Sequence, residues 1–94
     1  MIPESRFLIR LHRSARQHLR AIPQELRKHI IERISGLTIE PYPHDVKILR
    51  GKRGSHREPV QRIRAGDYRI LYVVRQNPKE IIILDVDHRK DVYR

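Results

Sequence analysis

The fold of this chain is decided by the stretch RIRAGDYRILY, residues 62–72. Polar and apolar side chains alternate on both sides of Gly66-Asp67, a pair compatible with a tight turn whose first position needs a positive φ. Alternation of this kind is typical of half-buried strands. We therefore predict a hairpin of two antiparallel strands, 60–65 and 68–75.

A two-residue turn also fixes which side chains share a face of this hairpin. It places Ala65 opposite Tyr68 and Arg64 opposite Arg69, and residues that lie opposite each other point to the same side of a sheet. One side then receives apolar residues that need a cover, namely Ile63, Ile70, Tyr72 and Val74. The other side receives three arginines, namely Arg62, Arg64 and Arg69.

These arginines allow two interpretations. A lone surface arginine usually covers apolar groups with its stem and keeps its head in water. Like charges directly opposite each other on a sheet, however, cost up to about 1 kcal/mol a pair. Three arginines on one face therefore favour an anion site, because the planar guanidinium grips phosphate oxygens in pairs.

The remaining sequence supplies helices and further strands. Residues 6–11 alternate as a strand, and Ser14 stands three residues before Gln17, the spacing of a capping box that predicts a short helix from there. Pro23 ends that helix and opens a second one, which stops at Gly36. The apolar stripe of the second helix comprises Leu26, Ile30, Ile31, Ile34 and Leu37. Two more strands are expected, a short one at 46–49 and a very apolar, central one at 81–86.

The length of 94 residues leaves room for one core, so we expect a single domain, 1–94. The elements together predict the α+β class. An N-terminal strand and a helical hairpin should pack on a mainly antiparallel sheet of four to five strands.

The charge is unevenly distributed. The chain carries 21 basic and 11 acidic side chains, a net charge of +10, and residues 47–75 hold nine of the basic ones with only two acidic ones. Such a surplus favours a polyanionic partner, either a phosphate backbone, an acidic protein or, less often, an anionic membrane. Residues 51–57 form a polar loop between glycines that we expect to be mobile.

Several kinds of site are excluded or disfavoured. The absence of cysteine excludes disulfides, thiolate zinc sites and Fe–S clusters and suits a reducing cytoplasm. No apolar run approaches the roughly 20 residues that span a bilayer, so we expect a soluble cytoplasmic protein without a membrane partner. The histidines lack metal-ligand spacing, and the positive field around Asp85-Val86-Asp87-His88 argues against a cation there. We expect no metal and no cofactor.

The last seven residues are HRKDVYR, and their orientation depends on the strand before them. If Arg75 pairs with Glu80, alternation places His88 on the face of the arginines, whereas a bulge near Asp87 brings Arg89 there instead. The sequence leaves both arrangements open. His88 can move a proton near neutral pH, although a histidine at a strand end is more often a surface group.

The order of elements, the hairpin RIRAGDYRILY and the closing HRKDVYR resemble the RelE toxins of bacterial toxin–antitoxin pairs over essentially the whole chain. The hairpin motif is shared with ParE-type gyrase inhibitors, and the closing motif leans toward the RNA-cleaving branch. Members of that branch enter the ribosomal A site and cut messenger RNA there. The resemblance implies a type II toxin whose partners are the ribosome, mRNA and an acidic, RelB-like antitoxin.

The resemblance also implies roles for individual residues. The candidate catalytic residues are Arg62, Arg69, His88, Arg89 and Tyr93. The candidate RNA-binding residues are Lys47, Arg50, Lys52, Arg53, Arg57, Arg64 and Lys90. A second basic strand residue that some relatives carry falls on Val60 here, so Arg64 or a loop residue would supply that charge.

The implied chemistry is metal-independent attack of an RNA 2′-hydroxyl on the adjacent phosphate, which leaves a cyclic phosphate and a 5′-hydroxyl. Arg69 and Arg89 would stabilise the negative charge of the transition state, and Arg62 would orient the phosphate. His88 would be the acid or base, because the pKa of an arginine exceeds about 12. Tyr93 would stack on the target base, unless it packs back on the sheet.

Two alternatives remain from the sequence. One is a ParE-like inhibitor of DNA gyrase without nuclease chemistry. The other is a noncatalytic RNA- or ribosome-binding domain, which a basic composition alone would support.

Overall fold

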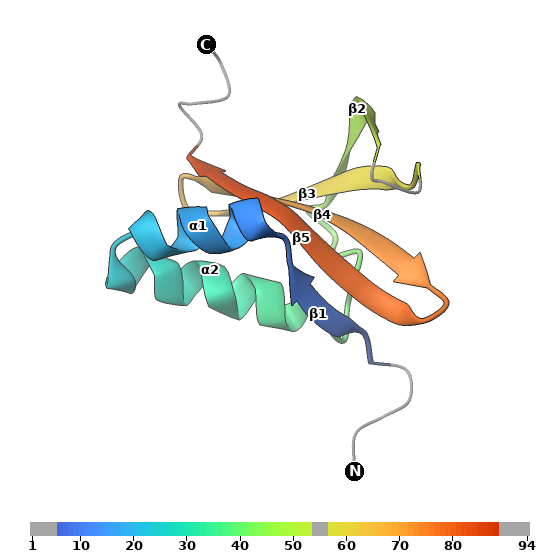
Figure 1. The fold of residues 1–94 in the computed structure, drawn as a ribbon, viewed down its shortest axis with the longest axis horizontal. Coiled ribbons are helices and arrows are strands. Elements are labelled where there is room, and N and C mark those ends of the chain that lie inside the picture. The colour runs from blue at the N-terminus through green and yellow to red at the C-terminus, as the bar shows by residue number, and fades with distance from the viewer. Residues whose placement is uncertain (1–5, 54–56, 89–94) are drawn as a thin grey trace.

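The computed structural model describes residues 6–53 and 57–88. Two helices, α1 (Arg13–Ala21) and α2 (Gln24–Gly36), lie on one face of a five-stranded sheet (Figure 1). The strands are β1 (Leu8–Leu11), β2 (Lys47–Arg53), β3 (Pro59–Ala65), β4 (Tyr68–Gln76) and β5 (Lys79–His88). The predicted α+β class is confirmed.

The strands lie in the order β1-β5-β4-β3-β2. Only β1 and β5 run parallel, and the other three neighbouring pairs are antiparallel. A parallel pair needs a crossover, which the two helices provide. The apolar strand expected at 81–86 is β5, but the central position belongs to β4, because β1 adds to the outer side of β5.

The start of α1 differs from the prediction. His12 is the N-cap, and its Nδ1 accepts a hydrogen bond from the backbone N–H of Ser14 at 3.2 Å. Ser14 lies inside the helix and donates from Oγ to Asp85 of β5 at 3.1 Å, so the expected capping box with Gln17 is wrong. Neither helix in the described ranges is long and apolar enough to cross a membrane.

The second helix buries a narrower stripe than expected. Ile30, Ile34 and Leu37 are buried in the core between helices and sheet. Leu26 and Ile31 remain 50% and 47% exposed, because the sheet and α1 meet only one side of α2. Pro23 is the N-cap of α2 and separates it from α1, in line with its predicted role as a helix breaker.

The segment expected as a mobile loop at 51–57 belongs partly to the sheet. β2 continues from Lys47 to Arg53, with a register shift between Leu49 and Arg53 where Gly51 takes a φ of +79°. A positive φ suits glycine because it has no Cβ. Residues 54–56 of the predicted loop lie outside the described ranges.

Candidate functional site

The hairpin of β3 and β4 has the predicted register. Arg64 lies opposite Arg69, Ile63 opposite Ile70 and Arg62 opposite Leu71. The turn glycine, Gly66, has a φ of +61°. Ile63 and Ile70 are buried against the helices, so their neighbours along each strand point to the helix-free side of the sheet. We call four basic residues on that side the arginine face: Lys47, Arg62, Arg64 and Arg69.

The arginine face extends over three neighbouring strands, because Lys47 of β2 lies opposite Arg62 of β3. Burial differs between its members. Arg64 and Lys47 are exposed, Arg62 is half-buried, and Arg69 is only 7% exposed. Among the described residues, none makes a hydrogen bond with Nε of Arg69. A buried donor without an acceptor is costly in a folded protein, and an anion is one group that could supply the acceptor.

The other end of the same sheet face is organised differently. Arg75, six residues after Arg69 on β4, bonds to Glu58 at 3.0 Å and to Glu80 at 3.5 Å, and Arg10 also reaches Glu80 at 3.4 Å. Apolar side chains separate the two ends, namely Leu49, Val60, Leu71, Val73, Ile82 and Leu84. The arginines at one end are thus neutralised within the molecule, whereas the arginine face concentrates positive charge.

A β-bulge decides what lies beside Arg69. Arg75 pairs with Glu80 as supposed, but Leu84 has no partner on β4, and the register beyond it shifts by one residue. Asp87 therefore lies opposite Arg69. His88 lies opposite Tyr68, whose ring it meets edge-on at 5.1 Å on the side of the helices. Of the two arrangements that the sequence left open, the structure has the one with a bulge, which lies at Leu84 rather than near Asp87 and keeps His88 off the arginine face.

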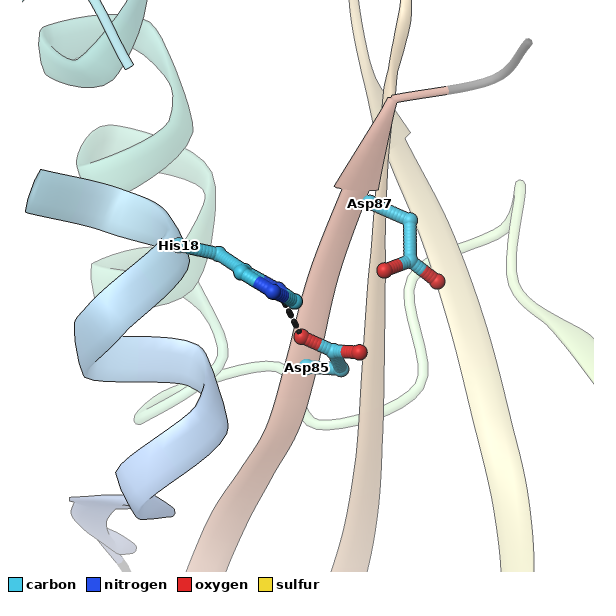
Figure 2. A group of neighbouring side chains, drawn as sticks. All are labelled: His18, Asp85 and Asp87. Carbon is cyan, nitrogen blue, oxygen red and sulfur yellow. Dashed lines mark hydrogen bonds and ion pairs between the residues drawn. The ribbon is translucent and has the colours of Figure 1, made fainter. Parts of the chain in front are cut away.

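The same bulge joins β5 to α1 through a small polar cluster (Figure 2). Asp85 accepts from Ser14 Oγ at 3.1 Å, pairs with His18 Nδ1 at 2.6 Å and accepts from the backbone N–H of Val86 at 2.9 Å. One donor atom each from His18, Asp85 and Asp87 lie within 4.8 Å of one another. Sequence reasoning missed this cluster, since nothing in the local pattern marks the bulge.

The two carboxyl groups of the cluster have opposite pKa shifts. Burial raises the pKa of Asp85, but its hydrogen bonds with Asp87, His18 and the Val86 backbone outweigh that effect and bring it below the ordinary 3.8. Burial and the adjacent Asp85 raise the pKa of Asp87 above 3.8, and the charge of Arg69 opposes part of that rise. Asp85 is therefore the carboxylate, and Asp87 takes up a proton first.

Carboxylate and imidazole groups are also metal ligands. Here, hydrogen bonds within the cluster occupy Asp85, and Asp87 lies opposite Arg69 on β4, whose positive charge acts on it. The hydrogen bonds of Asp85 and the positive charge of Arg69 near Asp87 explain this cluster without a metal ion, and we assign no metal to it.

The other candidate residues are spread more widely. Arg50, Lys52 and Arg53 are exposed on β2, and Arg53 donates to the Lys52 carbonyl at 2.9 Å. Arg57 is exposed with a φ of +66°. Three further candidates lie outside the described residues, namely Arg89, Lys90 and Tyr93. The structure thus brings together Lys47, Arg62, Arg64 and Arg69.

A second surface lies on the opposite side of the molecule. An apolar groove of about 420 Å³ runs between β1 and α2, and its lining includes Ile9, Leu11, Ile31 and Ile34. β1 is an edge strand, and its Leu8 is exposed. An apolar groove beside an unpaired edge is a feature of protein-binding surfaces.

Comparison with known proteins identifies the family. The family model described as the ParE toxin of the type II toxin–antitoxin system parDE matches residues 9–93. The chain is 30% identical to toxin RelG of Mycobacterium tuberculosis over 94% of its own length and 97% of that protein.

Solved structures agree with this match. The archaeal RelE–RelB complex from Pyrococcus horikoshii matches with a TM-score of 0.73 and 29% identity, over 88% of this chain and 94% of that one. The toxin–antitoxin complex RelBE2 from Mycobacterium tuberculosis matches with a TM-score of 0.71 and 28% identity, over 89% of this chain and 99% of that one. The chain therefore belongs to the RelE/ParE superfamily of type II toxin–antitoxin systems, as a RelE-type toxin.

Proposed function

We propose that this toxin is an mRNA interferase that cleaves ribosome-bound messenger RNA in the A site. One observation carries the proposal: a buried Arg69, whose Nε has no hydrogen-bond partner among the described residues, lies within a face of basic side chains. A phosphodiester supplies both the negative charge and the acceptor oxygens that such a group lacks. The RelE-type relatives support the same reading.

The proposed reaction needs a surface that stabilises charge. The RNA 2′-hydroxyl attacks the adjacent phosphate, the bond to the 5′-oxygen breaks, and a cyclic phosphate and a 5′-hydroxyl remain. The transition state carries more negative charge than the ground state. A guanidinium fixed in a partly desolvated position stabilises it preferentially, which raises the rate. Arg69 is our candidate for this role, and Arg62 and Lys47 would orient the phosphate from the neighbouring strands.

The remaining catalytic roles rest on the family resemblance. Arg89 is proposed as a second transition-state cation, and Tyr93 as the group that stacks on the target base. His88 is not proposed as the acid or base, because its ring packs against Tyr68 on the other side of the sheet. The proposed chemistry uses no metal ion.

The test is cleavage of mRNA on purified ribosomes by the purified toxin. We expect products with cyclic phosphate and 5′-hydroxyl ends, and no cleavage where a 2′-deoxynucleotide replaces the reacting nucleotide. Arg69→Met should lower the cleavage rate at least about 100-fold, as loss of a transition-state charge does. The matched control is Arg20→Met, which removes one exposed positive charge from α1. Equal activity of the two variants would overturn the role of Arg69.

Inhibition of DNA gyrase is the second candidate, because the matching family model is described as a ParE toxin. Intact message together with blocked supercoiling and accumulating DNA breaks would favour it. A noncatalytic binding domain would bind ribosomes in a salt-sensitive manner and leave the message uncut.

We also propose that an acidic, RelB-like antitoxin neutralises the toxin. The solved relatives from Pyrococcus horikoshii and Methanococcus jannaschii are complexes of RelE with RelB. The net charge of +10 favours an acidic partner, and the groove between β1 and α2 fits the apolar side of an amphipathic segment. Ile31→Glu in this groove should weaken capture of an acidic, RelB-like antitoxin. Ile48→Glu, on the opposite edge strand β2 and 60% exposed, is the control and should leave capture unchanged.

A further inference from the structure

The residue that lies beside Arg69 is an acid. The register Arg64–Arg69–Asp87 runs across three neighbouring strands, so a carboxyl group closes one end of a row that begins with two arginines. The bulge at Leu84 creates this arrangement, because without it a different residue of β5 would lie opposite Arg69. Arg69, the least exposed residue of the arginine face, therefore lies opposite an acid of the same molecule. This acid can compete with any bound anion for the guanidinium of Arg69.

The surroundings of Asp87 determine how strongly it competes. The charged and titratable groups around Asp87 are Arg69, opposite it on β4, and His18 and Asp85, whose donor atoms lie within 4.8 Å of its own. His88 lines the same pocket as Asp87, and Arg64 lies beyond Arg69 on the next strand. Asp85 is held as a carboxylate by Ser14, His18 and the backbone of Val86. A fixed negative charge so close to Asp87 makes ionisation of Asp87 harder, and the buried location adds to this effect.

We propose that Asp87 is a positioning residue for Arg69 that competes with the RNA phosphate for its guanidinium. When Asp87 is ionised, it attracts Arg69 and repels an incoming phosphate. When Asp87 is protonated, Arg69 is free to bind the phosphate. Asp85 and His18 set the balance from the helix side of the sheet. This inference rests on the proposed function, because it takes the arginine face as the surface that binds RNA.

Binding and protonation of Asp87 must then be linked. A phosphate that engages Arg69 removes the favourable neighbour of the Asp87 carboxylate and adds a negative charge near it. Both changes raise the pKa of Asp87, so RNA binding should be accompanied by proton uptake at this group. The reciprocal effect is that binding should weaken as rising pH ionises Asp87.

The experiment measures affinity for a 2′-O-methyl RNA oligonucleotide, which cannot be cleaved because it has no 2′-hydroxyl. Affinity is followed between pH 5 and pH 8 at constant ionic strength. Asp87→Asn should bind about three- to tenfold more tightly than the wild type near pH 7.5, since one competing charge is gone. The advantage should shrink as the pH is lowered and the wild-type carboxyl takes up its proton.

Asp67→Asn is the matched control, because Asp67 is an exposed acid in the turn of the same hairpin. It changes the net charge equally and should shift affinity less than about twofold, without a pH-dependent difference. Equal behaviour of the two variants at every pH would overturn the proposal.

A second measurement uses the wild-type chain and does not depend on a variant folding. The carboxyl carbon of Asp87 is titrated by NMR with and without saturating oligonucleotide, and its midpoint should rise on binding. An unchanged midpoint would contradict the linkage. Binding of the same oligonucleotide by Arg69→Met distinguishes failure of the proposed function from failure of the role proposed for Asp87. If it binds as tightly as the wild type, the arginine face is not the RNA surface and the proposed function fails as well. If it binds weakly while Asp87→Asn equals Asp67→Asn, only the role of Asp87 is lost.

Discussion

Two arginines on one strand should respond in opposite ways to the same substitution. Arg69 and Arg75 both lie on β4 and point to the helix-free side of the sheet. Arg69 is 7% exposed, and its Nε has no hydrogen-bond acceptor among the described residues. Arg75 is bonded to Glu58 and Glu80. Replacing each by methionine keeps the length of the side chain and removes the charge.

The contacts of the two arginines give the expected change in the free energy of unfolding for each variant. For Arg69→Met, removal of a buried donor without an acceptor gains about 1–3 kcal/mol, and relief of the like charge of Arg64 gains up to about 1 kcal/mol. Loss of the attraction to Asp87 costs roughly 1 kcal/mol. The net effect is a stabilisation of about 1–2 kcal/mol. Arg75→Met leaves the buried Glu80 with only Arg10 as partner among the described contacts and should destabilise by about 2–3 kcal/mol.

Urea unfolding followed by circular dichroism measures both variants. With a slope of about 1 kcal/mol per molar urea for a small domain, the midpoint of Arg69→Met should rise by about 1–2 M and that of Arg75→Met should fall by about 2 M or more. Arg69→Met, the more stable of the two variants, is also the one that we expect to lose RNA cleavage. Residues that serve binding or catalysis often lower the stability of the free protein, so replacing them can raise stability and lower activity together. A lower urea midpoint for Arg69→Met than for the wild type would refute the view that the buried Nε of Arg69 has no acceptor among the described residues.

Four further predictions concern the fold. Tyr72→Phe removes the hydrogen bond from the phenol to the Pro41 carbonyl, which is 2.7 Å long, and should lower the stability by about 1–2 kcal/mol in a thermal melt. Burial raises the pKa of Tyr72 far above its ordinary 10, so absorbance of the tyrosines at high pH should show one phenol that stays protonated well above pH 10 and is lost from the spectrum in Tyr72→Phe. The pKa of Asp85 is lower in the folded protein than its unfolded value of 3.8, so the Asp85 carboxylate stabilises the fold above pH 3.8. This contribution is lost as the pH falls through the folded pKa. In Asp85→Asn, the free energy of unfolding should therefore fall less steeply with decreasing pH in the acid range. Gly66→Ala forces a Cβ into a φ of +61° and should cost roughly 1 kcal/mol, whereas Gly66→Asn should cost less.

The parts of the fold that depend on local chemistry were predictable. Gly66-Asp67 and the alternation around it determine a two-residue hairpin, so the register of Arg64 with Arg69 could be derived and is confirmed. Pro23 and Gly36 likewise bound the second helix as expected. Each of these signals acts over a few residues, and no distant contact overrides it.

The parts that depend on distant contacts were not predictable. Ser14 carries the spacing of a capping box, yet it bonds to Asp85 on the last described strand instead. The bulge at Leu84 serves an apolar cluster on one face of the sheet and the polar contacts of Asp85 on the other. Alternation alone cannot reveal an extra residue of this kind, so it could not decide between His88 and Arg89 and left Asp87 unnoticed as the neighbour of Arg69.

The pairing of the first strand with the last has a consequence for how the toxin comes into being. β1 is synthesised first, but its partner β5 is synthesised only after both helices and three other strands, with Leu8 meeting Glu80. Contacts so far apart in sequence form late and slowly. A nascent chain can close its local hairpin early, but it cannot complete the sheet until Lys79–His88 has left the exit tunnel. Toxicity would therefore begin only after this stretch has emerged, so a partner present beforehand meets an unfinished molecule.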